Sequence, residues 1–134
     1  MINAVVDANV FISALVFGGQ PLAVLTLGRT NQCKLVVSTE TILEVQRIIA
    51  VKFTDFTPEL SGLTRFIAEF CTTLPAGQPQ VFAELRDPHD SHILQAALTA
   101  QATHVVTGDK DLLSLDPWRG CSILTSTQFV ELLQ

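Results

Sequence analysis

Four acidic residues occupy positions from which their carboxylates could act together on a metal ion. Asp7 directly follows a short apolar run, and Asp109 follows another one after Thr107-Gly108. Glu44 falls in the second turn of an expected helix, and Asp90 falls in the first turn of another. Converging carboxylates repel one another and raise each other's pKa unless a cation lies between them. Hard divalent ions prefer such oxygen ligands, and Mg²⁺ is the usual ion where phosphate is the substrate.

The chemistry that such a cluster supports is hydrolysis at phosphorus. One or two bound ions could lower the pKa of an attacking water and neutralise charge on a scissile phosphate. The formal net charge of -5, from 13 acidic and 8 basic residues, disfavours binding to the negatively charged phosphates of a nucleic acid. Without the four acids named above, however, 9 acidic residues remain against 8 basic ones. Much of the negative charge is therefore expected at one place, where cations would bind.

Each acid also has a purely structural explanation. Asp7 could end its strand as a turn residue, and Asp109 could cap a short turn that follows it. Glu44 precedes Arg47 by three residues and could form a solvated ion pair with it. Asp90 could simply be favoured by the dipole of its helix. These alternatives stay open from the sequence alone.

Further polar residues could support the four acids. Asp87 is expected to cap the helix that contains Asp90. Asn9, two residues after Asp7, could orient a ligand or a water molecule, or could cap the helix that it precedes. Asp111 and Thr107 are possible supporting residues on either side of Asp109.

The elements that must position these residues alternate between strands and helices. Strands are expected at 3–6, 35–37, 72–74, 104–107 and 121–124. Helices are expected at 9–15, 21–30, 39–50, 58–70 and 88–102, with a last helix capped by Ser126. This alternation predicts an α/β fold with a parallel sheet covered on both faces. Ligands bind beyond the carboxyl ends of such strands, so all four acids are expected toward that edge.

The bulk composition limits the other possibilities. The chain has 134 residues, 48% apolar and 16% charged, and shows no repeat or linker, so one domain over 1–134 is expected. Apolar runs such as Ile48–Val51 are far shorter than the roughly 20 residues of a membrane span. The N-terminus shows no signal-peptide pattern, which predicts a cytoplasmic protein with Cys33, Cys71 and Cys121 as reduced, buried thiols.

Four segments of the chain resemble, in order, the motifs of PIN-domain ribonucleases. The first is Val-Val-Asp-Ala-Asn-Val-Phe-Ile-Ser-Ala from Val5 to Ala14. The second is Glu-Val-Gln-Arg at 44–47, and the third is Asp-Pro-His-Asp at 87–90. The fourth is Thr-Gly-Asp-Lys-Asp-Leu-Leu at 107–113. Each motif alone is weak, but four in the family's order are a specific signal.

The resemblance implies a three-layer α/β/α sandwich with a central, mainly parallel sheet, and cleavage of single-stranded RNA with Mg²⁺ or Mn²⁺. It makes Asp7, Glu44, Asp90 and Asp109 the catalytic and metal-binding residues. The chain looks most similar to the subgroup described as toxins of toxin–antitoxin systems, such as the VapC toxins. A homodimer or higher homo-oligomer and a small protein antitoxin are then expected partners. In that subgroup the third acid is often followed by a second Asp, where this chain has Ser91.

Other function classes fit less well. A phosphoacceptor receiver domain would need a lysine after the last strand, where residues 123–126 contain none. A haloacid-dehalogenase-like phosphatase would need an aspartate at the position of Asn9. The alternative that stays open is a non-catalytic PIN-like scaffold that binds RNA or protein.

Contacts to RNA and to a protein partner are the least defined features. No basic run marks an RNA path, and the candidate cations are Arg47, Arg86, Lys110 and Arg119. A partner is expected to cover part of an apolar surface at Phe53, Phe56, Phe66 and Phe70. Core packing of these four phenylalanines is the alternative explanation.

Overall fold

A computed structural model describes all 134 residues of the chain and contains a five-stranded parallel sheet. The strand order is β3-β2-β1-β4-β5, and every neighbouring pair is parallel. The strands are β1 (Asn3–Val6), β2 (Lys34–Ser38), β3 (Cys71–Leu74), β4 (His104–Val106) and β5 (Ser122–Leu124). The expectation of a mainly parallel sheet is thus met by one that is parallel throughout.

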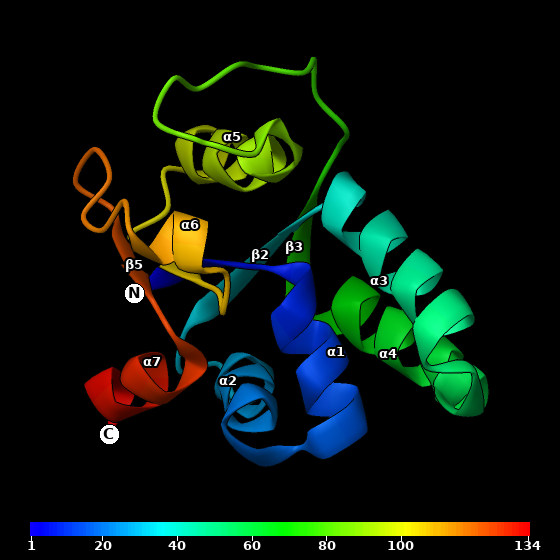
Figure 1. Ribbon diagram of the computed structural model, residues 1–134. Helices are drawn as coiled ribbons and strands as arrows, with labels where there is room; N and C mark the ends of the chain where they lie inside the picture. The colour runs from blue at the N-terminus through cyan, green and yellow to red at the C-terminus, as the bar shows by residue number, and fades with distance from the viewer.

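Helical segments connect the strands and cover the sheet. They are α1 (Ala8–Phe17), α2 (Gly19–Arg29), α3 (Thr39–Lys52), α4 (Thr57–Phe70), α5 (Ser91–Ala100), α6 (Lys110–Leu113) and α7 (Ser126–Leu133). Two short 3-10 turns, η1 (Thr54–Phe56) and η2 (Pro88–Asp90), precede α4 and α5. Figure 1 shows α5 and α6 on one side of the sheet and the other helices on the opposite side.

The two faces of the sheet bury two separate cores, as strand alternation requires. Val5, Val36 and Val105 point into a core of 12 buried residues beneath α5 and α6. Their neighbours Val6 and Val37 point into the larger core of 19 buried residues beneath the remaining helices. The three-layer α/β/α sandwich predicted from the sequence is therefore confirmed.

The strand order makes the carboxyl ends of β1 and β4 the natural site for a ligand. The chain builds β1, β2 and β3 side by side, then crosses over to place β4 on the other flank of β1. Such a reversal leaves a crevice where the connections at two neighbouring strand ends diverge. Asp7 follows β1 at this point, and Thr107 follows β4.

Several expected element boundaries were wrong. The segment after Asp87 begins as η2, and regular helix starts only at Ser91 and ends at Ala100. The last helix is capped by Thr125 in a capping box with Gln128, and not by Ser126. The first helix begins at Ala8, because Asp7 and not Asn9 is its N-cap.

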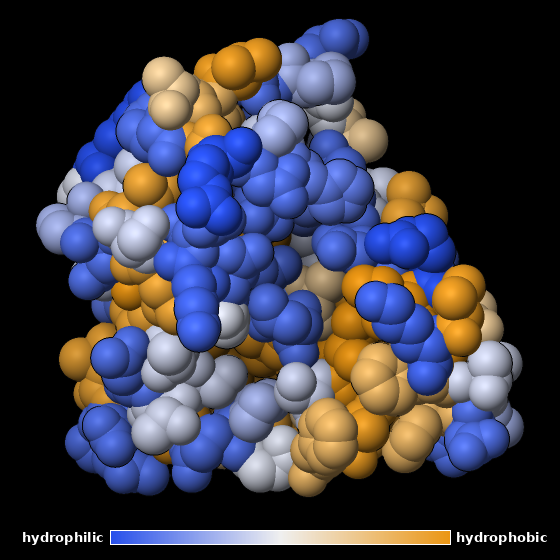
Figure 2. Space-filling model, in the orientation of Figure 1, coloured by the Kyte–Doolittle hydropathy of each residue, from blue (hydrophilic) through white to orange (hydrophobic).

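The surface divides into polar and apolar regions. Figure 2 shows hydrophilic residues gathered over α5 and α6, and apolar colour concentrated at the lower right, over α1, α3 and α4. Phe53, Phe56 and Phe66 are half-buried and pack against the larger core. The ring centroids of Phe66 and Phe70 are 5.1 Å apart, with the rings tilted by 44°.

No single helix is long and apolar enough to cross a bilayer. Helices α1 and α2 reach the required length and apolar character only when taken together, and the pair is bent by 109°.

Candidate active site

The buried polar residues of the chain all lie at the carboxyl edge of the sheet. They number four: Asp7, Ser38, Thr41 and Thr107. A buried polar group is costly unless it is hydrogen-bonded, and such groups are uncommon away from functional or structural networks. The chain therefore concentrates its buried polar side chains at this one edge of the sheet.

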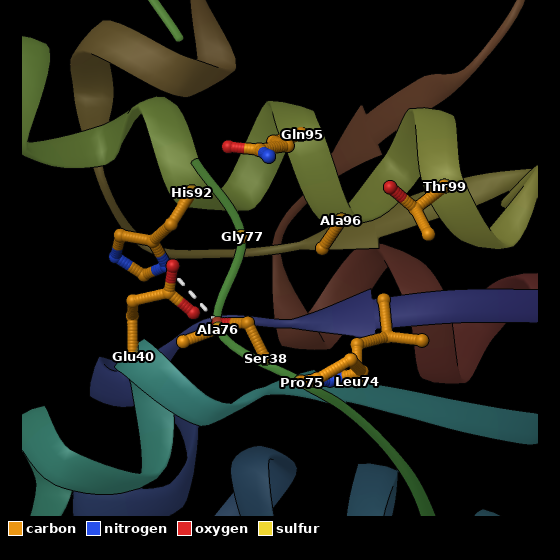
Figure 3. Close-up of a pocket in the computed structure, with 10 residues that line it drawn as sticks. All are labelled: Ser38, Glu40, Leu74, Pro75, Ala76, Gly77, His92, Gln95, Ala96 and Thr99. Atoms are coloured by element: carbon orange, nitrogen blue, oxygen red, sulfur yellow. Dashed lines mark hydrogen bonds between the residues drawn. The ribbon is translucent and has the colours of Figure 1, made fainter. Parts of the chain in front are cut away.

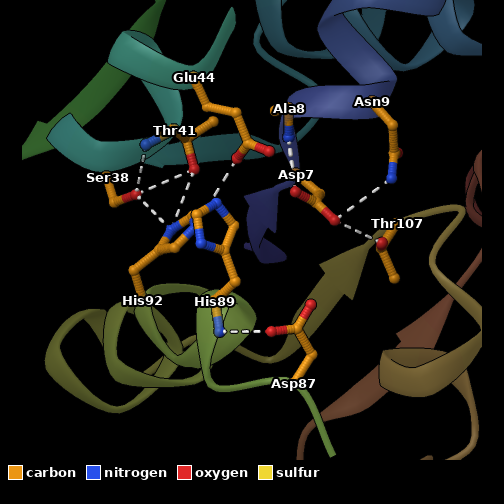
Figure 4. Close-up of polar contacts among 10 residues, drawn as sticks. All are labelled: Asp7, Ala8, Asn9, Ser38, Thr41, Glu44, Asp87, His89, His92 and Thr107. Carbon is orange, nitrogen blue, oxygen red and sulfur yellow. Dashed lines mark hydrogen bonds and ion pairs between the residues drawn. The ribbon is translucent and has the colours of Figure 1, made fainter. Parts of the chain in front are cut away.

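Asp7 is the most constrained of these residues. Its carboxylate is 6% exposed and accepts hydrogen bonds on both oxygens. The backbone N–H of Ala8 donates to Oδ1 at 2.7 Å, and the Thr107 hydroxyl donates to Oδ2 at 2.7 Å. The Asn9 amide donates to the same Oδ2 at 3.3 Å, as Figure 4 shows. These bonds hold the carboxylate in one orientation without any help from a cation.

The pKa of Asp7 reports the balance of these contacts. Burial raises the pKa above its usual value, and the negative charge of Glu44 raises it further. The hydrogen bonds from Thr107 and Ala8 and the charge of a protonated His92 lower it, but burial is the larger effect. A bound cation would relieve this cost.

Asn9 and Thr107 connect Asp7 to the fourth acid. The Asn9 Oδ1 atom accepts from the backbone N–H of Gly108 at 3.1 Å, and the Thr107 Oγ1 atom accepts from that of Asp109 at 3.0 Å. Asp109 in turn accepts from the backbone N–H groups of Asp111 and Leu112, at 2.8 and 3.4 Å, and so caps α6. We call Asp7, Asn9, Thr107, Gly108 and Asp109 the strand-end cluster.

Asp90 faces this cluster from the start of α5. Burial raises the pKa of Asp90 to about 7, together with a hydrogen bond and charge repulsion from Asp109 and the charges of Asp7 and Asp87. The carboxyl groups of Asp90 and Asp109 therefore lie within hydrogen-bonding reach of each other. Asp87 itself accepts from the backbone N–H of His89 at 2.9 Å and caps η2, as its structural explanation predicted.

Glu44 lies on the other side of Asp7 and has a partner that the sequence did not predict. Its Oε2 atom is 3.8 Å from His92 Nε2, and it forms no ion pair with Arg47. The His92 Nδ1 atom contacts the hydroxyls of Ser38 at 3.1 Å and Thr41 at 3.4 Å. We call Ser38, Thr41, Glu44 and His92 the helix-pair cluster, because it joins α3 to α5. No spacing in the sequence singled out His92, since its partners are distant along the chain.

The donor set fits a hard cation held by few protein ligands. No three acidic, histidine or cysteine side chains converge closely enough to form a closed metal cage. Mg²⁺ does not need one, because it usually retains several waters and binds one or two carboxylates together with substrate phosphates. Burial is the main cause of the raised pKa values of Asp7 and Asp90, and the charges of neighbouring acids raise them further. Asp7, Asp90 and Asp109 are the residues that could hold the ion.

Comparison with known proteins agrees with this geometry. The family model described as "PIN domain" matches residues 3–111 of the chain. The chain belongs to the PIN-domain family. PIN domains are generally nucleases and usually depend on divalent metal ions, so the chain has a nuclease-type fold.

A solved structure supports the fold of this PIN domain independently. The crystal structure of PAE2754 from Pyrobaculum aerophilum superposes with a TM-score of 0.66 at 13% sequence identity. The match covers 98% of this chain and 89% of the other. At that identity it bears on the fold alone. No curated protein matches the chain.

The residues proposed from sequence fall into two groups in this PIN domain. Asp7 and Asp109 are linked through Thr107, Asn9 supports Asp7, and both acids raise the pKa of the nearby Asp90, although the three carboxylates do not converge on one point. Glu44 is close enough to influence Asp7 but is directed toward His92. The backbone N–H of Asp111 is bonded to Asp109, but its carboxylate has no contact with another of these acids.

Proposed function

We propose that this PIN domain is a metal-dependent endoribonuclease that cleaves single-stranded RNA. The observation that carries the proposal is the buried Asp7 carboxylate, which is oriented on both oxygens and has two further acids, Asp90 and Asp109, at the same edge of the sheet. A structural turn residue would have no reason to be buried beside two further acids. The four motifs that resemble the ribonucleases of the family support the choice of substrate.

The residues of the chain would act by positioning. A divalent ion, when bound, supplies charge neutralisation at the scissile phosphate and a more acidic water. Ala8 and Thr107 hold the Asp7 carboxylate in position, so no free energy is needed to reorient it during the reaction. Asp90 and Asp109 would hold the ion through their carboxylate oxygens. Glu44 would complete the negative face from the side of α3.

The biological role is proposed on the family resemblance. We propose that the protein is the toxin of a toxin–antitoxin pair, that it forms a homodimer, and that a small antitoxin covers part of its apolar surface. Its RNA contacts would come from Arg47, Arg86 and Lys110, which form no ion pair. Arg119 is a weaker candidate, because it lies 3.6 Å from Glu84 and its guanidinium is 4.6 Å from the Trp118 ring centre.

The test of the nuclease proposal is direct. Purified protein is incubated with a mixed RNA pool in Mg²⁺, in Mn²⁺ and in EDTA, and the products are resolved by length. Cleavage that requires the metal and disappears in EDTA is expected. A protein that leaves the pool intact under all three conditions would refute the proposal.

The second candidate is a non-catalytic scaffold that binds RNA or protein. The observation in its favour is that no three metal-binding side chains converge and that Glu44 is directed toward His92. Retention of all four family acids argues for the nuclease. RNA binding without metal-dependent cleavage in the same experiment would favour the scaffold.

A further inference from the structure

A small cavity lies beside the acids, between the start of α3 and the side of α5. Its volume is about 160 Å³, and the segment that follows β3 forms its outer wall (Figure 3). Polar side chains project into it from both helices, namely Glu40 from α3 and Gln95 and Thr99 from α5. Apolar contact comes from Leu74, Pro75 and Ala96. The cavity therefore combines an apolar wall with a few polar groups, which is the usual composition of a binding site.

The cavity borders the helix-pair cluster. Ser38 and His92, two members of that cluster, line it. A wider groove of about 430 Å³ shares Glu40, His92 and Gln95 with it and extends to Glu44 and Arg47. An RNA strand that lay in this wider groove would thus have one nucleotide within reach of the small cavity.

Two polar side chains of the cavity, Glu40 and Gln95, have no partner within the protein, whereas Ser38 and His92 are bonded to each other. The side chains of Glu40 and Gln95 make no hydrogen bond, and Glu40 makes no ion pair, although both are half-buried. The wall of the cavity approaches Gln95 closely at Gly77, where an added Cβ would be 2.5 Å from the Gln95 Nε2 atom. Glycine at 77 therefore keeps the cavity open beside the amide.

We propose that this cavity binds one unpaired base of the RNA next to the cleaved bond, and that guanine is the base it prefers; the proposal rests on the ribonuclease function above. Its volume is about five times the roughly 30 Å³ of one water, which suits a single planar base. Proteins read single-stranded RNA by taking such unstacked bases into pockets and bonding their Watson–Crick edges.

The choice of guanine follows from the Glu40 carboxylate. A carboxylate only accepts hydrogen bonds, so it selects bases that donate and disfavours an approaching phosphate. Guanine presents two adjacent donors, N1–H and the 2-amino group, to the two carboxylate oxygens. Adenine, cytosine and uracil each present a single donor group on that edge. Gln95 can donate to the guanine O6 atom, and Arg47 in the wider groove can contact the adjoining phosphate.

Binding is measured without cleavage by using the Asp7→Asn protein and short fluorescent oligouridylates that carry one central test base. Guanine is expected to bind about tenfold more tightly than uracil, and inosine, which lacks the 2-amino group, is expected to lose most of that gain. Glu40→Gln should reduce the guanine preference to near unity. Glu59→Gln is the matched control, because Glu59 is also a first-turn glutamate but is exposed on α4. The guanine preference of this variant should equal that of the parent protein.

Equal affinity for guanine, inosine and uracil, a guanine preference that survives Glu40→Gln, or no RNA binding would each overturn the proposal. Gln95→Ala provides a second test if Glu40→Gln does not fold, and it should also reduce the preference. Mapping the ends of RNA cut by the wild-type protein separates the two proposals. Cuts without a base preference would overturn the cavity assignment alone, whereas discriminating binding without any cutting would overturn the nuclease function alone.

Discussion

The strand-end cluster and the helix-pair cluster hold acids of the same expected function in different ways. In the strand-end cluster, Asp7 and Asp109 each accept at least one hydrogen bond from a backbone N–H. In the helix-pair cluster, the Glu44 carboxylate contacts only another side chain, His92, at 3.8 Å. Backbone groups at a strand end or helix start have little freedom, whereas two side chains on separate helices can rotate.

This difference suggests a division of labour between the two clusters. A carboxylate bonded to the backbone is oriented before a ligand arrives, and such preorganisation is the main way that proteins stabilise developing charge. A carboxylate held by a histidine can change position when a metal ion or an RNA phosphate binds. We therefore expect substitutions in the strand-end cluster to have larger effects than those in the helix-pair cluster.

The largest effect is expected for Asp7→Asn. The substitution retains the shape of the side chain but removes the charge that would hold the cation. The loss of transition-state stabilisation should lower the rate of RNA cleavage at least about a hundredfold. The measurement is the cleavage rate in Mn²⁺, with circular dichroism to show that the fold is intact. Asp55→Asn, at an exposed acid of η1, is the matched control and should cleave normally. Near wild-type cleavage by folded Asp7→Asn protein would contradict the central role of this cluster.

The second prediction concerns the stability of the metal-free protein. Asp7 and Asp90 have raised pKa values when folded, so the folded state binds more protons than the unfolded state. The free energy of unfolding should therefore fall as pH rises from roughly 4 to about 7. This range lies between the ordinary pKa of an Asp in the unfolded chain and the raised pKa of Asp90 in the folded protein. Added Mg²⁺ should reverse the loss, by about 2.7 kcal/mol at a hundredfold excess over its dissociation constant.

Asp7→Asn sharpens the same prediction, because it removes repulsion and a metal ligand together. In EDTA at neutral pH it should melt at a higher temperature than the wild type, yet it should gain less from Mg²⁺. Thermal melts at several pH values, with EDTA or with Mg²⁺, provide the measurement. The acids would not form one site if the wild type showed no Mg²⁺ shift and the variant were no more stable in EDTA.

The same two clusters show what the sequence could predict. Asp7 was identifiable because a β-branched run ending in Asp-Ala-Asn marks a strand end, and the cap of α6 by Asp109 was an evident alternative. The bonds from Gly108 to Asn9 and from Thr107 to Asp7 join residues about a hundred positions apart. They depend on the pairing of β1 with β4, which only the tertiary fold determines. His92 was not identified for the same reason, since neither periodicity nor motif relates it to Glu44.

A matched pair of threonine substitutions compares the clusters directly. Thr107 and Thr41 are both buried, and valine has nearly the same shape as threonine. Thr107→Val leaves the Asp109 N–H without its acceptor and Asp7 Oδ2 without its closest donor. Unsatisfied buried groups cost about 1–3 kcal/mol, so a lower free energy of unfolding and about tenfold weaker Mn²⁺ binding are expected. Thr41→Val should lower stability, with little effect on Mn²⁺ affinity. Equal Mn²⁺ affinities of the two variants would contradict the proposed difference between the clusters.

The smallest effect is expected for His92→Ala, which removes the only contact of the Glu44 carboxylate. Both side chains are partly exposed, and ion pairs of that kind contribute roughly 0.2–1 kcal/mol, which corresponds to about a 1.4- to fivefold change. Because His92 also lines the small cavity, Mn²⁺ affinity should be measured without RNA, so that base binding does not contribute. His92→Gln should recover part of the loss, since its amide can still contact Ser38 or Glu44. If His92→Ala instead weakened Mn²⁺ binding as strongly as Asp7→Asn, Glu44 would be a rigidly held ligand, and the distinction between the two clusters would fail.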